Sequence, residues 1–384
     1  MAVCLSGSRA GMLSLLVVGI YMGYPRFRTF RAYQKTVIIL VLTISVGIAY
    51  FVKKDSADGR MLIWKCTWNM IKEQPVTGHG IGAFQAHYMD YQAEYFKENP
   101  ESEWRMLADN VRHPFNEYLY LWIQGGVGAL LVVFMLGVFL YRYYVRYFSW
   151  NKKGAMASLL SISVFSLFSY PFNYPFTWIV FALNLYVLMR NYPYLYTLSK
   201  YKKAFAICLE LIGFIYLIQV VGDFKNEREW KKVADKSLMG QTEKMLPRYG
   251  ELCKGLGHNP FFLYNYAAEL YTGGRYEKCL DVCLQCRKYW ADYDLEILLG
   301  ETYTQLKRYE EAIRHFELAA DMCPVRFTPL YKLYHVYKQC NRVKESQMLA
   351  WRILHKEVKI PSQEIERMQT EMRRELEKMP SSCL

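Results

Sequence analysis

The stretch that decides the fold is residues 59–128. It opens as GRMLIWKCTWNMIKEQPVTGHGIGAF (59–84) and closes, continued to residue 131, as ADNVRHPFNEYLYLWIQGGVGALL (108–131). Apolar segments long enough to approach a bilayer crossing lie on both sides of it. The stretch also carries three of the seven histidines, at His79, His87 and His113. We therefore interpret it as a polar segment that bears reactive groups and is flanked by membrane helices.

Outward from this stretch, the chain has two unlike halves. Residues 1–222 are dominated by Leu, Val, Ile, Phe and Tyr, whereas the remainder is charged and periodic. The first half predicts a polytopic helical membrane domain with about six spans and a polar outer loop over 53–116. The fourth and fifth spans are short and are joined by the proline-marked turn 171–175, which predicts a helical hairpin. The six spans are expected at 3–20, 36–52, 118–141, 155–170, 176–189 and 204–221.

The net charge of +13 raises the question of nucleic-acid binding, but its distribution argues against that class. Three short basic segments between apolar runs, 24–35, 142–154 and 190–203, contain no acidic residue and supply twelve of these charges. Short basic loops of this kind mark the cytoplasmic side of a membrane protein. This pattern predicts a multi-pass membrane protein, with loop 53–116 and the chain after residue 221 on the outer side of the membrane. A cytoplasmic repeat region is the alternative, because seven cysteines follow residue 252 and an oxidising compartment is unusual for them.

The second half contains an internal repeat. Arg275, Arg308 and Arg342 lie 33 and 34 residues apart, and each follows one amphipathic pattern and precedes another. The period and pattern resemble the tetratricopeptide repeat, in which helix pairs stack because neither helix alone can bury its apolar face. We predict an all-α chain: a membrane domain over 1–222, a tetratricopeptide α-solenoid over 223–361, and a capping helix and tail over 362–384.

Two groups of side chains raise the possibility of a metal site. Cys279, Cys283 and Cys286 share one face of a predicted helix, so three small buried residues are the favoured interpretation. His79 and His87 have no carboxylate or third histidine at ligand spacing. We predict no metal site. The glycines around His79 are not a phosphate-binding P-loop, because no Gly-Lys-Ser/Thr follows them.

Three residues are candidates for chemistry on physical grounds. Arg9 lies near the outer end of the first span, where a charge faces a cavity or partner or else reaches the interface. Arg60 either binds an anion or contacts lipid headgroups. His113 lies at the outer interface, where it could act as a general base or be an ordinary satisfied histidine.

Four motifs occur in an order that resembles the O-antigen ligase and polymerase family. They are SGSRAG at 6–11, GRxxxW at 59–64, EQPVTGHGIGAF at 73–84 and HPFNEYLYLWIQGGVGALL at 113–131. The resemblance covers roughly residues 1–190. It implies a membrane glycosyltransferase that moves a glycan from a polyprenyl-pyrophosphate carrier to an acceptor hydroxyl of a lipid, glycan or protein, without cofactor or metal.

The resemblance also implies roles for particular residues. Arg9, Arg60 and Arg112 would hold the pyrophosphate, and His113 would be the base. The expected partners are membrane lipid, the polyprenyl-linked glycan, the acceptor (glycan, lipid A core or protein) and a protein bound by the repeats; no nucleic acid is expected.

The chain departs from the family in two ways. Phe115 occupies the place where many relatives have a histidine. Such proteins usually have ten or more spans with SGSRAG near the middle, so we expect an N-terminally truncated reading frame, one half of a split protein or a degenerate relative. The alternative function is a non-catalytic, membrane-anchored repeat scaffold for envelope polysaccharide assembly.

Overall fold

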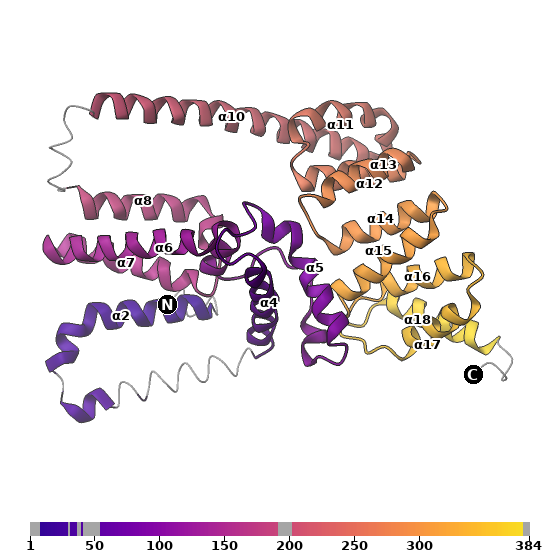
Figure 1. Ribbon diagram of the computed structural model, residues 1–384, viewed down its shortest axis with the longest axis horizontal. Coiled ribbons are helices and arrows are strands. Elements are labelled where there is room, and N and C mark those ends of the chain that lie inside the picture. The colour runs from indigo at the N-terminus through magenta and orange to yellow at the C-terminus, as the bar shows by residue number, and fades with distance from the viewer. Residues whose placement is uncertain (1–7, 30, 37–39, 41–53, 191–201, 379–384) are drawn as a thin grey trace. The chain divides into compact units, whose positions relative to one another are not determined.

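The computed structural model describes residues 8–29, 31–36, 40, 54–190 and 202–378. Every regular element within these ranges is helical, which confirms the predicted all-α class for the described part of the chain. The chain divides into two compact units (Figure 1). The first comprises Met1–Phe84 and Arg112–Ala206, and the second comprises Gln85–Val111 and Ile207–Leu384.

The first unit is a group of helices in which α7 is central. Helix α7 packs against α2, α6 and α8, and α4 packs against α6. These helices run as α2 (Arg9–Thr29), α4 (Lys54–Glu73), α6 (Glu117–Arg146), α7 (Trp150–Ser166) and α8 (Pro175–Met189), with the short 3₁₀ helix η2 (Pro171–Asn173) before α8.

Small and polar side chains hold the helices around α7 together. The Ser14 hydroxyl of α2 lies 2.8 Å from the Ser161 carbonyl oxygen and 2.7 Å from the Ser161 hydroxyl of α7. On the other side of α7, the Asn184 amide of α8 donates to the Ser158 hydroxyl at 3.0 Å. Close packing through small residues and polar contacts between helices is typical of membrane bundles, where apolar surface drives no association.

The membrane spans predicted from the sequence are confirmed only in part. Among the described residues, α6 is the one helix that is both long and apolar enough to cross a bilayer; the apolar stretch Ala10–Pro25 of α2 and helix α8 are shorter. The expected second span, 36–52, lies almost wholly outside the described residues, so the count of six stays a prediction. Helix α7 starts five residues before the predicted fourth span because Ser149 accepts the Lys152 N–H as an N-cap.

The predicted outer loop 53–116 is mostly helical where the structure describes it. It contains α4, the helix α5 (Ala83–Glu98) and the 3₁₀ helix η1 (Glu103–Leu107). The sequence assigned this whole loop to the membrane domain. In the structure, Gln85–Val111 clusters with the second unit instead.

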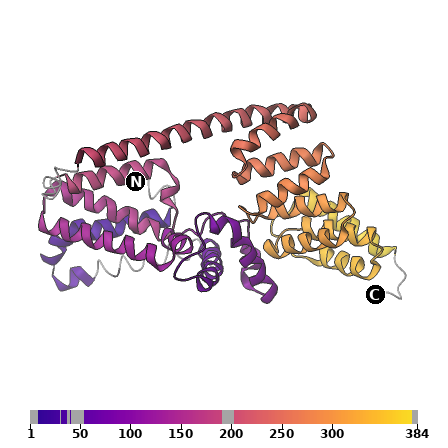
Figure 2. The same ribbon diagram turned by 45° about the horizontal axis from the view of Figure 1, so that its top comes forward.

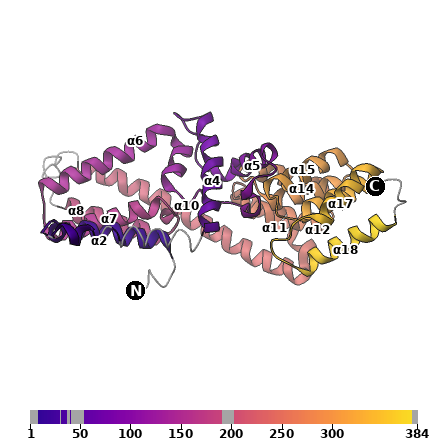
Figure 3. The same cartoon turned by 90° about the horizontal axis from the view of Figure 1, so that it is seen from below.

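The second unit is a stack of helix pairs that follows the long helix α10 (Lys202–Lys236). Each helix from α11 to α18 packs against the next, and α12 also contacts α14, as α14 contacts α16 (Figure 2). Helix α18 lies beside α17 at the end of the stack, as expected for the predicted capping helix (Figure 3). After the π-helix η4 (Ser237–Gln241), the elements are α11 (Thr242–Leu256), α12 (Pro260–Thr272), α13 (Tyr276–Arg287), α14 (Tyr293–Gln305), α15 (Tyr309–Met322), α16 (Thr328–Gln339), α17 (Val343–His355) and α18 (Gln363–Glu377).

The 33–34-residue period has a backbone cause. Each periodic arginine follows a residue with positive φ: Gly274 at 68°, Lys307 at 59° and Asn341 at 58°. The N–H of each arginine then donates to a carbonyl five residues back, at 2.8–2.9 Å, which is the C-terminal closure of a helix. The arginines therefore mark where the second helix of each pair begins, and the predicted repeat is confirmed as three helix pairs.

Candidate functional site

The glycine-rich turn is locked into a break in α6. Gly126 has φ 63° and interrupts the helix. The His79 N–H donates to the Ile123 carbonyl oxygen at 2.6 Å and the Gly80 N–H to that of Gln124 at 3.1 Å, while the Val127 N–H donates to the Pro75 carbonyl oxygen at 3.0 Å. The turn thus satisfies backbone groups that the break releases, as an interrupted membrane helix requires.

Glycine is required on both sides of this junction. A Cβ on Gly126 would lie 1.9 Å from the Val76 carbonyl oxygen, and one on Gly78 would lie 2.6 Å from the Gly126 nitrogen. The two motifs EQPVTGHGIGAF and IQGGVG therefore form one structural junction, in which the glycines permit backbone contact.

His79 belongs to this junction. Its Nε2 lies 2.7 Å from the Met70 carbonyl oxygen, so that ring nitrogen donates and the histidine closes α4 onto the turn. No group of three or more His, Cys, Asp or Glu side chains suited to a metal ion occurs in the described ranges. Cys279, Cys283 and Cys286 are buried on one face of α13, as interpreted from their spacing.

His113 lies just before α6 and contacts the turn before α8. Its ring stacks on Tyr170, with centroids 4.6 Å apart and planes at 27°. The Asn173 amide nitrogen is 2.9 Å from Nε2 of His113. Because an amide nitrogen only donates, Nε2 accepts here and the ring is neutral, with its proton on Nδ1.

The electrostatic surroundings of His113 favour this neutral form. Partial burial lowers the pKa of His113 below its usual value, and the neighbouring Arg112 charge lowers it further. A neutral ring with an accepting nitrogen is the state that a general base needs near pH 7.

Arg60 and His113 are brought together by shared aromatic neighbours. The Arg60 guanidinium lies 5.4 Å from the centre of the Phe115 ring and interacts electrostatically with Tyr170. Phe115 itself contacts Tyr170 at 5.2 Å. The spacing of the motif GRxxxW places Trp64 one helical turn after Arg60, on the same face of α4. The Trp64 indole N–H donates to the Pro114 carbonyl oxygen at 2.9 Å.

The backbone at Phe115 is strained. Its φ is 52°, in the left-handed region that a bulky residue rarely adopts. Such a conformation costs about 1–3 kcal/mol and persists only where its surroundings enforce it. The residues on both sides of Phe115 are held in place. Pro114 accepts the Trp64 indole N–H through its carbonyl oxygen. Asn116 is the N-cap of α6 and accepts the N–H groups of Tyr118 and Leu119 at 2.9 and 3.0 Å.

The structure gives fewer contacts for the other two predicted site residues, Arg112 and Arg9. Arg112 is exposed and near enough to His113 to act on its pKa. Arg9 is the first residue of α2, and its side chain lies outside what the structure describes.

Sequence reasoning missed part of the site. Asn173 and Tyr170 come from the turn 171–175 and its approach, which we interpreted only as a hairpin connection. Glu117 joins this turn to α6, because its carboxylate accepts the Phe172 N–H at 3.0 Å. The one available signal was an asparagine between aromatic residues in a proline-marked turn.

One comparison with known proteins matches the N-terminal part of the chain. Residues 1–134 match the sequence model of the O-antigen ligase family. This match contains the glycine junction, Arg60, Arg112 and His113, and ends before Tyr170 and Asn173. No curated protein matches the chain.

Solved structures similar to part of the chain include two of MamA. One is MamA 41-end from Desulfovibrio magneticus RS-1, with 16% identity, a TM-score of 0.34, and coverage of 40% of this chain and 88% of that one. The other is the MamA RS-1 ArsTM double mutant, with 16% identity, a TM-score of 0.32, and coverage of 40% and 78%.

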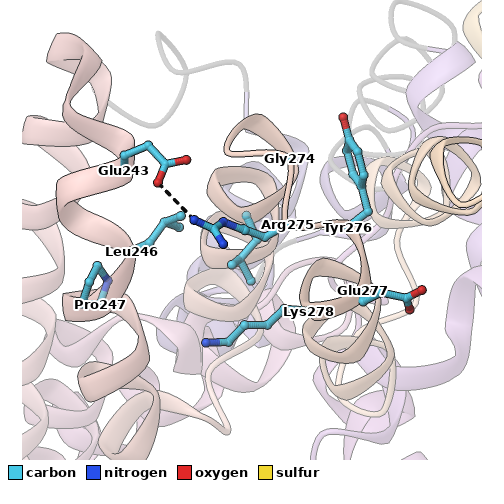
Figure 4. A pocket seen from close by; sticks show the side chains of 9 residues that line it. Glu243, Leu246, Pro247, Gly274, Arg275, Tyr276, Glu277 and Lys278 are labelled. Atoms are coloured by element: carbon cyan, nitrogen blue, oxygen red, sulfur yellow. Dashed lines mark ion pairs between the residues drawn. The ribbon is translucent and has the colours of Figure 1, made fainter.

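The second unit has an open hollow of about 550 Å³ between α11 and the α12–α13 turn (Figure 4). Arg275, the first of the periodic arginines, reaches Glu243 across it at 3.6 Å. Lys278 extends from α13 on the same side as Arg275, whereas the Glu277 side chain points away from it; Leu246 and Pro247 form the α11 wall. The hollow is therefore a mixed-charge surface with a small apolar wall.

Proposed function

We propose that the chain is a membrane glycosyltransferase of the O-antigen ligase type. It transfers a glycan from a polyprenyl-pyrophosphate carrier to an acceptor hydroxyl on the periplasmic side of the inner membrane. The observation that carries the proposal is one cluster in the first unit, where a neutral, half-buried His113 shares aromatic neighbours with Arg60 and has Arg112 beside it. Most of that cluster falls within the residues that match the O-antigen ligase model.

The chemistry follows from the charges that develop. The acceptor hydroxyl oxygen attacks the anomeric carbon while its proton passes to Nε2 of His113, where the hydroxyl replaces the Asn173 amide. The bond from the anomeric carbon to the pyrophosphate oxygen breaks, its electron pair stays on the carrier, and the anomeric carbon inverts. The growing negative charge is stabilised by guanidinium groups. No metal or cofactor enters this scheme; Arg60 and Arg112, with Arg9, supply the cationic charge.

Site substitutions test this proposal directly. Arg60→Ala is expected to reduce transfer about 10²–10³-fold, as does loss of one preorganised charge donor. Arg60→Lys is expected to recover little, because lysine lacks the planar fork. His113→Ala removes the base and is expected to cost about 10²–10⁴-fold. The matched control is Arg28→Ala, at an exposed arginine of α2. Transfer would be followed with labelled donor in membranes, and site variants as active as this control would refute the proposal.

The pH dependence of transfer gives a second test. A base acts only when neutral, so the rate should fall with acidification through the pKa of His113. Because that pKa is lowered, the acid limb should lie below pH 6.5, the ordinary histidine value. Arg112→Gln should move the limb toward pH 6.5, since one lowering charge is removed. An acid limb unchanged by this substitution would contradict the assignment of His113 as the base.

The second candidate function is a membrane-anchored scaffold for envelope polysaccharide assembly. The hollow around Arg275 favours it, because a mixed-charge surface with an apolar wall suits a peptide segment of a partner protein. In cross-linking from a photoreactive group at Lys278 in intact cells, a scaffold would be joined to one defined protein. That result together with inactive wild-type membranes would favour the scaffold over the enzyme.

A further inference from the structure

The end of α6 and the start of α7 hold two cations against the same aromatic ring. The Lys152 ammonium lies 5.5 Å from the centre of the Tyr147 ring, and the Arg146 guanidinium lies 5.7 Å from it. Lys152 also lies 4.5 Å from the centre of the Tyr143 ring and donates to the Tyr143 hydroxyl at 3.4 Å. Two positive charges are therefore gathered around one tyrosine, although like charges repel each other.

Local structure fixes this arrangement. Tyr143 and Tyr147 lie one helical turn apart, and their ring centroids are 4.9 Å apart. The connection from α6 to α7 is short, and the Ser149 hydroxyl accepts the Lys152 N–H at 3.3 Å as the N-cap of α7. The cap sets where α7 begins and so holds Lys152 beside the two rings. The cluster thus forms within one helix–turn–helix of the first unit.

The two cations differ in their exposure to solvent. Lys152 is only 5% exposed, whereas Arg146 is exposed. A buried ammonium group loses its hydration, and the loss must be compensated by other groups. Tyrosine rings and a hydroxyl attract the ammonium but carry no counter-charge, and a cation–π contact recovers less than the burial of an ion costs. Lys152 therefore needs an anion, and the exposed Arg146 beside it can bind the same anion.

The first unit has no carboxylate placed to compensate Lys152. Residues 1–54 contain no Asp or Glu, and neither do residues 118–209. The acids of the first unit are therefore those of α4 and Glu117. Glu117 begins the 30-residue helix that Arg146 ends, and α4 meets α6 near its start, where two tryptophan rings are in contact. All of these carboxylates belong to the other end of α6, so the first unit supplies no counter-charge here.

Exposed aromatic side chains lie beside the two cations. Trp150, the first residue of α7, is 75% exposed, and its ring contacts that of the exposed Phe148 with centroids 6.0 Å apart. Exposed rings next to cations are typical of the membrane–water interface, where rings lie among the lipids and cations meet the phosphates of anionic headgroups. A site for a dissolved anion has no need of such rings. They favour a lipid as the source of the anion.

We propose that Arg146 and Lys152 bind the phosphate of an anionic phospholipid at the basic end of the first unit. The guanidinium donates to two phosphate oxygens, and the ammonium group acts as a compact positive charge beside them. Phe148 and Trp150 lie against the acyl chains. The bound lipid fastens the turn between α6 and α7 to the membrane interface. This role does not depend on glycan transfer.

The test uses the full-length protein in phosphatidylcholine nanodiscs that contain increasing fractions of phosphatidylglycerol. The main variant is Arg146→Gln/Lys152→Met, in which methionine keeps an apolar stem in the buried position. Its matched control is Arg28→Gln/Arg31→Gln, which removes two exposed charges from the basic segment 24–35. The readouts are the phosphatidylglycerol retained by the released protein in native mass spectrometry, and the midpoint of thermal unfolding at each lipid composition.

The wild type is expected to prefer phosphatidylglycerol over phosphatidylcholine by about 20-fold, since each cation near an anionic headgroup contributes about fivefold. The double variant should lose this preference, and phosphatidylglycerol should no longer raise its unfolding midpoint. The control should lose less than about twofold. Arg146→Gln alone changes only an exposed side chain and should lose about fivefold, so the site is still tested if the double variant does not fold.

Three results would overturn the proposal. The first is a preference for phosphatidylglycerol that survives in both Arg146→Gln and the double variant. The second is an equal loss in the double variant and the control, which would mean that lipids respond only to the diffuse charge of this end. The third is inorganic phosphate that raises the unfolding midpoint in phosphatidylcholine nanodiscs as much as phosphatidylglycerol does, which would make the ligand a dissolved anion.

Discussion

The two units of this chain solve the packing problem in opposite ways. In the first, large apolar side chains face outward, with Phe134 of α6 68% exposed and Phe176 of α8 74% exposed, while Ser14 is buried between helices. In the second, aromatic residues fill the interior: Tyr249 and Tyr266 stack with centroids 5.4 Å apart and planes at 3°. This difference in exposed surface indicates the medium in which each unit is stable. The first unit fits an apolar medium and the second fits water.

The largest expected effect comes from breaking the junction of the first unit. Gly126→Ala places a Cβ 1.9 Å from the Val76 carbonyl oxygen at a φ of 63°. Both the clash and the strained φ oppose folding, so we expect the free energy of unfolding to fall by about 4 kcal/mol or more. The measurement is thermal unfolding and size-exclusion behaviour in detergent. Gly128→Ala, in the same helix with no atom near its added Cβ, is the control. Equal stability of the two variants would contradict the junction.

The corresponding change in the second unit should be milder. Gly300 of α14 faces Phe316 of α15, and an added Cβ would lie 2.6 Å from that ring. A side chain can move where a backbone cannot, so Gly300→Ala is expected to cost about 1–3 kcal/mol. Thermal unfolding of the full chain measures this cost. Adding Phe316→Leu should recover part of it; a double variant no more stable than Gly300→Ala would place the cost elsewhere.

Asp292 of the second unit should make the free energy of unfolding depend on pH. Burial raises the pKa of Asp292 to about 6, above roughly 4 for an unfolded aspartate. The folded state therefore binds a proton more readily, and this group's contribution is fully present below pH 4 and lost as pH rises through 6.

Asp292→Asn should remove this dependence. The gap in unfolding free energy between the wild type and the variant is expected to change by about 2 kcal/mol between pH 4 and 7, in favour of the variant. Urea unfolding at several pH values measures the gap, and a gap independent of pH would disprove the assignment.

The smallest effect tests the polar contacts of the first unit. Ser14→Ala removes the hydroxyl contact to Ser161 and is expected to cost about 0.6 kcal/mol, since hydrogen bonds between membrane helices contribute modestly. Ser163→Ala, which removes a bond within α7 to the Leu159 carbonyl oxygen, is the comparison. Unfolding in mixed micelles would measure both. A cost above about 2 kcal/mol would mean that Ser14 contributes through packing rather than through its hydrogen bond.

Parts of the architecture could be predicted because their causes are local. The periodic arginines mark helix starts since a turn residue with positive φ precedes each one. The apolar run of α6 is long enough to be recognised alone. Arg60 and His113 were selected by motif and residue chemistry, and the structure brings them to one aromatic cluster.

Other parts could not be predicted because they depend on distant pairs. Asn173 lies 60 residues from His113 and carries no pattern that signals the contact. The loop 53–116 was assigned wholly to the membrane domain because it lies between two predicted membrane spans. The anchoring of Gln85–Val111 in the second unit depends on its contacts with Arg287, Asp292 and Arg326, whose charges resemble those of any solvated helix end.

The sequence by itself determined the helical class, the repeat period, the apolar run of α6 and the residue types available for chemistry, since helix periodicity and turn geometry act over a few residues. Tertiary structure alone decided which glycine meets which backbone, which asparagine reaches His113, and that the segment before Arg112 is held by the repeats. Those outcomes depend on shape and hydrogen-bond satisfaction between segments far apart in the chain, and these are set only when the helices pack.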